Sequence, residues 1–298
     1  MICAPIRSLV LGDADYPPLL SVIADPPATL FARGPIPATL KALAIVGTRR
    51  PTPYGRRIAR RLAGECAQAG IAVVSGLARG IDTEAHRGVL EAGGVTWAVL
   101  GSGLDHIYPE ENVPLAEEIV ASGGAVLSEY PADRPPRPSQ FPQRNRIISA
   151  LSMGVVVVEG DMRSGALITA RAALSQGREV FAVPGPADCA MSEGPLELLR
   201  QGAAMARRLE DVLQELPQLA ACAAPAGGRL PCPMSRPDPV PHTLDEKKIL
   251  ELLQSGGVGF GELLARTGWE PARLIGTLSE LERRREVSAL PGQNYARN

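Results

Sequence analysis

Residues 42–55 read ALAIVGTRRPTPYG, and residues 71–183 repeat the kind of unit that they predict. The first five residues form a short apolar run with β-branched side chains, which is typical of a buried strand. A glycine follows at position 47, and Thr52 and Pro53 are residue types that favour the cap and the first position of a helix. The stretch therefore predicts a strand, a glycine turn and a helix in succession.

The same alternation of apolar runs and helical patterns continues on the C-terminal side of this unit. Further strands are predicted at 71–74, 95–100, 125–127, 155–158 and 180–183, and helices at 55–69, 82–92, 114–121 and 164–176. Because strand–helix–strand units cross over with one hand, these strands should form a mainly parallel sheet with helices on both faces. We therefore expect an α/β, Rossmann-like, doubly wound domain over residues 41–216, with residues 1–40 as a lead-in packed on its core.

A second, smaller domain is expected after Pro217. Residues 217–242 are rich in proline, alanine and glycine, which predicts a linker. Residues 243–298 then show three helical patterns followed by two short strands around a Pro-Gly turn. This order favours a winged-helix domain, and a plain helical bundle is the alternative.

Composition limits the classes of function. The formal net charge of -1 argues against a protein that coats nucleic acid by bulk positive charge, so any such contact must be a local basic site. Lysine occurs only at positions 41, 247 and 248, so nearly all the positive charge is arginine, whose planar fork suits phosphate oxygens.

The cysteines and the apolar runs indicate the compartment. The five cysteines are widely spaced with no C-x-x-C pair, which predicts reduced thiols and no metal site. No segment approaches the roughly 20 apolar residues of a membrane span. A cytoplasmic protein without a membrane partner is expected.

Three strand-to-helix turns have a composition that suits anions. They contribute Gly47, Thr48 and Arg49, then Gly76, Arg79 and Gly80, and finally Arg163, Ser164 and Gly165. The carboxyl ends of parallel strands meet at one edge of the sheet, where open α/β folds bind ligands. The helix that begins after Thr52 should also present free N–H groups to a phosphate. The alternative is a set of ordinary turns with exposed arginines.

Residues 134–146 carry four arginines, no acid and one aromatic side chain, Phe141. We expect a proline-stiffened arm that offers cations to phosphates and a ring face to a base. The alternative is a solvated loop whose Phe141 fills the core. Residues 105–118 carry five acids and no lysine or arginine, so that edge should repel a polyanion.

Catalytic patterns are missing from the sequence. The three histidines lie far apart, and no G-x-S-x-G, H-E-x-x-H or Walker A motif occurs. Gly101 and Gly103 follow a predicted strand, but the third glycine of a dinucleotide fingerprint is absent. No catalytic residue, cofactor or metal is expected.

The ordered set of these segments resembles the DprA/Smf family, DNA-processing protein A. The resemblance rests on Tyr16-Pro17-Pro18-Leu19-Leu20, Asp25-Pro26-Pro27, Gly47-Thr48-Arg49, Tyr54-Gly55, Ser75 to Asp82, Ala85 to Gly88, Tyr108-Pro109, Ser128 to Pro131, Phe141 to Ile148, Arg163 to Ala170 and Val183-Pro184-Gly185. It implies a protein without catalytic activity that binds incoming single-stranded DNA in natural transformation, forms a homodimer through the Rossmann-like domain and helps load the RecA recombinase.

The resemblance also assigns roles to residues. It places phosphate binding on Gly47, Thr48, Arg49, Gly76, Arg79, Gly80, Arg144, Asn145 and Arg146, and a base contact on Phe141. The chain departs from the family where Gly194-Pro195-Leu196 replaces the usual Gly-Thr-Asn. Apolar spacing in this region nevertheless suggests Leu196, Leu199 and Met205 for the dimer interface. We also expect the chain to differ from many relatives by the absence of their helical N-terminal extension.

Two other functions compete with this one. Related Rossmann-like domains bind or hydrolyse small nucleotides, but the Pro-Gly-Gly-x-Gly-Thr loop of such hydrolases does not occur here. Alternatively, the winged-helix domain could be the main module and bind duplex DNA. Its third predicted helix, 270–285, mixes acids with arginines and is a poor match to a major-groove reader.

Overall fold

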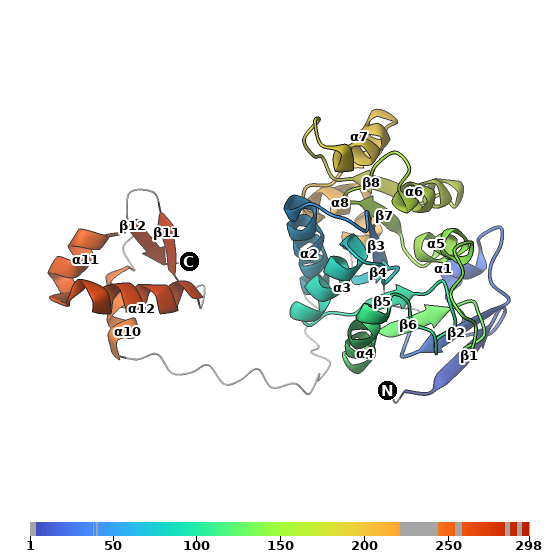
Figure 1. The fold of residues 1–298 in the computed structure, drawn as a ribbon, viewed down its shortest axis with the longest axis horizontal. Coiled ribbons are helices and arrows are strands. Elements are labelled where there is room, and N and C mark those ends of the chain that lie inside the picture. The colour runs from blue at the N-terminus through green and yellow to red at the C-terminus, as the bar shows by residue number, and fades with distance from the viewer. Residues whose placement is uncertain are drawn as a thin grey trace. The chain divides into compact units, whose positions relative to one another are not determined.

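The stretch 42–55 folds as predicted. Strand β3 (Ala42–Val46) is buried along its whole length, and helix α2 (Pro53–Gln68) begins with Thr52 as its N-cap and proline at its first position. The computed structural model describes residues 4–37, 39, 41–220, 244–253, 258–283, 287–290 and 294–297. The chain divides into two compact units, residues 1–230 and 231–298 (Figure 1).

The first unit is built on a sheet that has nine strands within its described residues. They are β1 (Ile6–Val10), β2 (Thr29–Arg33), β3, β4 (Ala72–Ser75), β5 (Thr96–Val99), β6 (Ala125–Ser128), β7 (Gly154–Val157), β8 (Glu179–Ala182) and β9 (Ala204–Met205). Their order is β1-β2-β6-β5-β4-β3-β7-β8-β9, and all the pairs from β6 to β9 are parallel. The predicted strands are all present, and the doubly wound, mainly parallel fold is confirmed.

The chain reverses its direction of winding between β3 and β7. From β3 it proceeds strand by strand to β6, and from β7 it proceeds on the other side to β9. Strands β3 and β7 run side by side in parallel, with Val46 opposite Val157. This pair forms the topological switch point, where open α/β sheets leave a crevice at the carboxyl ends of their strands.

Helices cover both faces of the sheet. They are α1 (Pro18–Ser21), α2, α3 (Ile81–Glu91), α4 (Val113–Ala121), α5 (Gln140–Ala150), α6 (Gly165–Ser175), α7 (Glu193–Arg200), α8 (Leu209–Glu215) and α9 (Pro217–Ala220), with single 3-10 turns at Glu110–Asn112 and Ala190–Ser192. Successive side chains of a strand point to opposite faces. Ala44 therefore packs in the core beneath α5 and α6, whereas Leu43 and Ile45 pack in the core beneath α2 and α3.

Several elements were not predicted. The N-terminal lead-in contributes β1 and β2, and β2 pairs antiparallel with β6 at one edge of the sheet. Within the stretch expected to be an extended arm, residues 140–146 belong to α5. The linker was expected from Pro217, but Pro217–Ala220 form α9 and Leu219 is fully buried in the core. The remainder of the expected linker, 221–242, lies outside the described residues.

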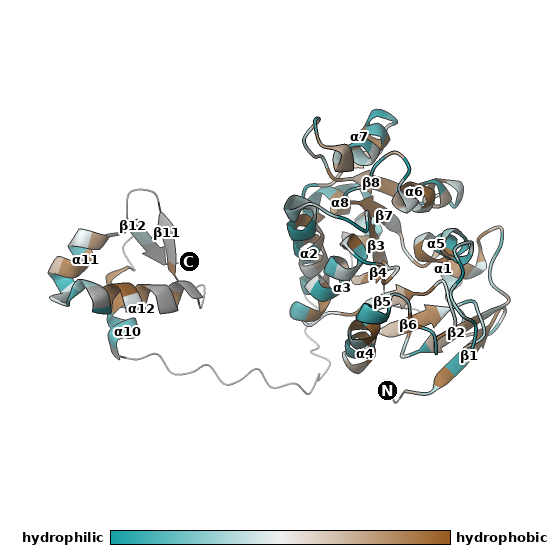
Figure 2. Ribbon diagram, in the orientation of Figure 1, coloured by the Kyte–Doolittle hydropathy of each residue, from teal (hydrophilic) through white to brown (hydrophobic). Residues whose placement is uncertain are grey.

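The second unit has the elements of a winged helix. Helices α10 (Leu244–Leu252), α11 (Phe260–Thr267) and α12 (Pro271–Arg283) accompany an antiparallel sheet of β10 (Val258–Gly259), β12 (Asn294–Arg297) and β11 (Val287–Leu290). Leu263, Leu274 and Leu281 are buried at its centre. The helices of both units mix hydrophobic and hydrophilic residues, as helices that cover a core on one side do (Figure 2). Within the described residues no helix is both long and apolar enough to span a bilayer.

Candidate nucleic-acid interface

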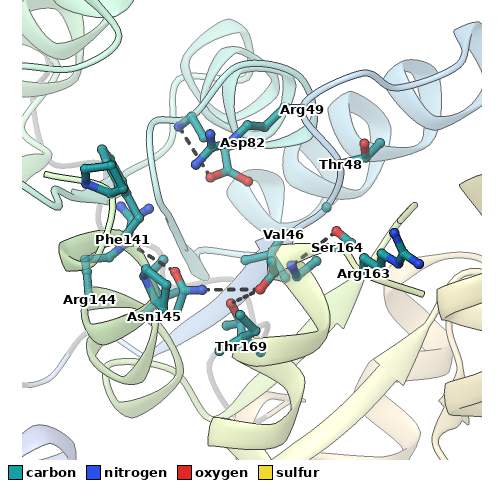
Figure 3. A pocket seen from close by; sticks show the side chains of 18 of the residues that line it. Val46, Thr48, Arg49, Asp82, Phe141, Arg144, Asn145, Arg163, Ser164 and Thr169 are labelled. Atoms are coloured by element: carbon teal, nitrogen blue, oxygen red, sulfur yellow. Dashed lines mark hydrogen bonds between the residues drawn. The ribbon is translucent and has the colours of Figure 1, made fainter. Parts of the chain in front are cut away.

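A cleft of about 810 Å³ opens at the switch point, and we call it the switch-point cleft. It brings together the predicted residues Gly47, Thr48, Arg49, Phe141, Arg144, Asn145, Arg163, Ser164 and Gly165. Figure 3 shows the side chains of α5 on one side of the cleft and those at the start of α6 on the other. Convergence of the first and third turns on one crevice is therefore observed.

The turn after β3 is fixed by its own neighbours. The Thr48 amide donates to the Glu159 carbonyl oxygen at 2.7 Å, and the Thr48 carbonyl accepts from the Ile81 amide at 3.2 Å. A Cβ added at Gly47 would lie 2.5 Å from Cγ1 of Ile81. The glycine thus lets this turn pack against α3, and the side chains of Thr48 and Arg49 remain at the cleft.

The N-terminus of α2 is not free to hold a phosphate, which corrects the sequence-based expectation. The Glu159 carboxylate accepts from the Thr52 amide at 2.8 Å and from the Thr52 hydroxyl at 2.5 Å. The same carboxylate packs against Gly55: a Cβ added at Gly55 would lie only 2.2 Å from Oε2 of Glu159. A carboxylate is favoured at a helix N-terminus for the same reasons as a phosphate, so Glu159 already occupies that position.

The N-terminus of α6 lies in the cleft wall instead. The Ser164 hydroxyl accepts from the Ala166 amide at 3.3 Å, and the first turn carries no acidic side chain. Gly165 is exposed, with open space where a Cβ would project. Arg163 is also exposed, and its side chain makes no ion pair with any residue that the structure describes. This end of the cleft can receive an anion.

Arg49 and two aromatic rings form the opposite part of the cleft. The Arg49 guanidinium lies 5.6 Å from the centre of the Phe141 ring, and the Phe141 and Tyr108 rings are 5.7 Å apart at a tilt of 55°. Phe141 is half-buried and belongs to none of the core clusters of the described chain. Its position at the cleft wall agrees with the predicted base contact.

Arg144 lies beneath the cleft and serves the fold. It is 4% exposed, and its guanidinium donates to the carbonyl oxygens of Gly76, at 2.8 Å, and of Val99. Burial lowers the pKa of Arg144 to about 10, so the side chain stays charged at neutral pH. Burial also raises the pKa of the neighbouring Asp82, whose carboxylate accepts from the Gly76 amide at 3.1 Å. Arg144 thus holds two strand ends together and is not free to grip a ligand.

The next two residues of α5 also have structural partners. The side-chain amide of Asn145 donates from Nδ2 to the Gly165 carbonyl oxygen at 3.2 Å and ties α5 to the start of α6. Arg146 forms a two-pronged pair with Glu129, at 3.1 and 2.8 Å, and a further contact with Asp25 at 3.1 Å. Arg146 is not among the residues that line the cleft.

The second turn lies beside the cleft. Gly76 and Arg79 line a small cavity of about 20 Å³ that shares Arg49, Tyr108 and Phe141 with the cleft. Arg79 pairs through two hydrogen bonds, of 2.8 and 2.9 Å, with Glu111. Gly80 has φ of 82° and would place a Cβ 2.4 Å from the Thr48 carbonyl oxygen, so glycine is required there. Glu111 belongs to residues 105–118, the stretch with five acids, so this stretch contacts the second turn through Arg79.

Some residues of the site were not predicted from the sequence. Tyr108 pairs with Phe141, and Ile148, Ile168 and Met191 add apolar surface to the cleft. The sequence around Met191 gives no sign that it lines the cleft, because Met191 lies in a 3-10 turn that is distant in sequence from the glycine turns. Tyr108 carried a signal, because Tyr108-Pro109 is among the motifs that resemble the family.

The residues expected at a dimer interface lie elsewhere. Leu196 and Leu199 are half-buried on α7, and Leu199 packs against the core. Met205 is 49% exposed on β9, the edge strand of the sheet. None of the three lines the switch-point cleft.

Sequence comparison identifies similar proteins along both units. The sequence model of DNA recombination-mediator protein A matches residues 7–217, and that of the DprA winged helix domain matches residues 233–293. Protein Smf of Escherichia coli is 47% identical over 214 residues, which are 71% of this chain and 57% of that protein. The DNA processing protein DprA of Bacillus subtilis is 46% identical over 215 residues, which are 72% of each chain. The chain thus spans little more than half the length of the Escherichia coli relative.

Two solved structures of DNA processing protein A are also similar to this chain. The X-ray structure of DNA processing protein A from Streptococcus pneumoniae matches with a TM-score of 0.66 and 40% identity, over 70% of this chain and 74% of that chain. A structure of DNA processing protein A from Helicobacter pylori, described for its single-stranded DNA binding mode, matches with a TM-score of 0.65 and 32% identity. That match covers 72% of this chain and 97% of the other.

Proposed function

Because this chain belongs to the DNA recombination-mediator protein A family, we propose that it binds single-stranded DNA in the switch-point cleft. The observation that carries the proposal is the combination of unpaired arginines with aromatic rings in one cleft. Four exposed arginines line it and make no ion pair within the described chain, and we call them the cleft arginines: Arg49, Arg50, Arg137 and Arg163. Phe141 and Tyr108 line the same cleft.

The two kinds of side chain divide the work of holding a strand. The cleft arginines and the N-terminus of α6 suit phosphate oxygens, because both offer N–H groups and positive charge. Phe141 suits a base, since every base has a ring face that stacks on an aromatic side chain. Neither contact reads base identity, so binding should be tolerant of sequence.

Membership of the family supports a proposal for the role of the cleft in the cell. We propose that the chain acts in the cytoplasm, protects incoming single strands during natural transformation and helps load the RecA recombinase, without catalysing a reaction. The two carboxylates that line the cleft, Asp82 and Asp161, accept hydrogen bonds from the backbone amides of Gly76 and Arg163. A nucleotide-hydrolysing activity is not favoured, since the similar proteins of Bacillus subtilis and Streptococcus pneumoniae are DNA processing proteins.

We also propose a homodimer that involves Leu196, Leu199 and Met205. The partial exposure of these apolar side chains supports it. Analytical ultracentrifugation of the full chain at micromolar concentration tests it, and a monomer would contradict it.

Binding of three ligands by the full chain tests the main proposal. Fluorescence anisotropy should show tight binding of a labelled single strand, weaker binding of the matching duplex and no competition by a nucleoside monophosphate at equal phosphate concentration. A duplex should bind less well because its bases are stacked and cannot reach Phe141. Preferential binding of the mononucleotide would favour the enzyme alternative, and preferential binding of the duplex would move the activity to the winged-helix unit.

A further inference from the structure

A second basic cavity adjoins the switch-point cleft and is not explained by the site described so far. It measures about 340 Å³, and we call it the arginine pocket. Four arginines, Arg49, Arg56, Arg79 and Arg87, line it together with Glu84 and Glu111. No aromatic side chain is among its lining residues. It therefore offers charge and hydrogen-bond donors but no surface for stacking a base.

Two packing features gather these arginines from separate segments. Helices α2 and α3 lie against each other through small buried residues such as Ala59 and Ala85, which brings Arg56 and Arg87 to the same side. At the end of this helix pair, Gly80 packs against the Thr48 carbonyl oxygen, which brings the turns that carry Arg79 and Arg49 together.

The pocket has more positive than negative charge. Glu111 pairs with Arg79, and Glu84 lies 3.6 Å from Arg56. Arg87 and Arg49 are exposed and make no ion pair with the residues that the structure describes. Four guanidinium groups against two carboxylates leave an excess of two positive charges. An anion that entered would also compete with Glu111 for the fork of Arg79.

The pocket is continuous with the cleft through shared residues. Arg49 lines both cavities, and the small cavity between them is lined by Arg49, Arg79, Tyr108 and Phe141. A strand whose base stacks on Phe141 would thus meet Arg79 next, on the far side of Arg49. Such a strand would contact the aromatic rings first, then Arg49, and then the arginine pocket.

We propose that the arginine pocket is a second binding site for the sugar-phosphate backbone, which holds the phosphates of a strand as it leaves the switch-point cleft. This inference rests on the proposed binding of single-stranded DNA. Glu111 acts as a resident counter-ion there: when a phosphate arrives, the two hydrogen bonds from Arg79 pass from the carboxylate to phosphate oxygens. Because the pocket has no stacking surface, it takes backbone and not a free base.

The test uses the full chain and thymidine strands from about 4 to about 16 nucleotides, the range of site sizes known for single-strand binding modules. Arg87→Ala should bind the shortest strands as the wild type does and the longest strands about tenfold more weakly, as loss of one charge-assisted contact implies. Its slope of log affinity against log salt should fall by about 0.7 for long strands only. Arg57→Ala is the matched control, because Arg57 lies exposed on α2 and lines neither cavity. It should bind every length as the wild type does.

A second variant predicts a change of the opposite sign. Glu111→Gln removes the competing carboxylate, so long strands should bind more tightly and the salt slope should rise, again with short strands unaffected. Both variants alter exposed side chains, and thermal unfolding checks that they remain folded. If Arg87→Ala and Glu111→Gln bind strands of every length with the same affinity as the wild type, the proposed role of the arginine pocket is wrong. Failure of the wild type to bind any single strand would instead overturn the proposed function.

Discussion

At the scale of single residues, two arginines that were expected to bind phosphate have different surroundings in the structure. Arg49 belongs to the first glycine turn, and Arg144 belongs to residues 134–146, the predicted arm. The structure leaves Arg49 exposed over the Phe141 ring, whereas it buries Arg144 against carbonyl oxygens of two strand ends. The difference comes from the partners that each guanidinium meets: Arg49 stays available for the proposed phosphate contact, whereas Arg144 supports the fold.

The pair Arg49 and Phe141 allows phosphate and base contacts to be measured separately. Arg49→Ala should weaken binding to every sequence and lower the salt slope by about 0.7, because a phosphate contact is lost. Phe141→Ala should cost about 1–3 kcal/mol of binding free energy through lost stacking and leave that slope nearly unchanged. Anisotropy titrations at several salt concentrations measure both quantities.

A strand without bases provides the control for this pair. It should bind the wild type about as weakly as an ordinary strand binds Phe141→Ala, since both lack the stacked base. If Arg49→Ala stays folded and keeps both affinity and salt slope, the phosphate contact is wrong. If Phe141→Ala unfolds the protein, the ring serves the core.

His86 makes the stability of the first unit depend on pH. It is fully buried, and its Nδ1 lies 2.7 Å from the Thr96 hydroxyl, which donates to the Val73 carbonyl. Nδ1 must then carry the proton, and Nε2 has no hydrogen-bond partner among the described residues. Burial, assisted by the positive charge of Arg144, lowers the pKa of His86 to about 3.

The pKa shift of His86 predicts a loss of stability in acid. The unfolded chain takes up a proton on this side chain below about pH 6.5, and the folded chain does so only near pH 3, so the free energy of unfolding falls as the pH drops between these values. The contribution should be about 2 kcal/mol at pH 5. Urea unfolding at pH 7.5 and pH 5 should show a drop smaller by about that amount in His86→Gln. An equal drop in both proteins would show that His86 does not cause it.

At the scale of elements, two helices that begin at the same edge of the sheet have different N-termini. Helix α2 begins on the Glu159 carboxylate, whereas α6 begins on the Ser164 hydroxyl next to exposed Gly165. The first is neutralised within the chain, and the second faces the cleft. An N-terminus with a favourable sequence is therefore a ligand site only when no carboxylate of the chain reaches it.

Glu159 should stabilise α2 without taking part in DNA binding. Glu159→Ala leaves the amide and hydroxyl of Thr52 without their acceptor, so the free energy of unfolding should fall by about 1–3 kcal/mol. Glu159→Gln keeps the shape and should lose less. Urea unfolding measures stability, and anisotropy well below the unfolding midpoint should show wild-type affinity for single strands. Lost affinity at unchanged stability would place Glu159 in the site.

At the scale of the whole molecule, all residues of the cleft lie in the first unit. They extend from Val46 to Met191, and the fold holds them at the point where the winding of the sheet reverses. The first unit is closed by α9, whose Leu219 is fully buried, and the Gln218 carbonyl accepts from the Lys41 ammonium at 2.7 Å. The limit of an independently folding unit should thus lie after α9.

Two fragments test this limit. Residues 1–220 should fold and bind single strands as the full chain does. Residues 1–216 should also bind, but should be less stable by about 1.5–3 kcal/mol, because the burial of Leu219 is lost. Urea unfolding and anisotropy of both fragments measure this. Loss of binding in the folded longer fragment would assign the activity to the winged-helix unit.

Patterns within short stretches of the chain were sufficient for the class of fold, the central strands and the convergence of the glycine turns on one edge. These features depend on side-chain period and on turn residues, and both are local. The strands β1 and β2 escaped prediction, because neither has the continuous apolar run of the central strands: both mix polar with apolar residues, and the burial of β2 alternates along its length. The helix α5 escaped because its N-terminal half is polar and follows several prolines.

The state of each charged group depended on tertiary contacts. Glu159 reaches Thr52 across 107 residues of sequence, Glu111 reaches Arg79 across 32, and Arg144 reaches Gly76 across 68. No local pattern contains both partners of such a pair. Whether an arginine is free for a phosphate depends on the carboxylates and carbonyl oxygens around it, and the folding of distant segments brings these groups together.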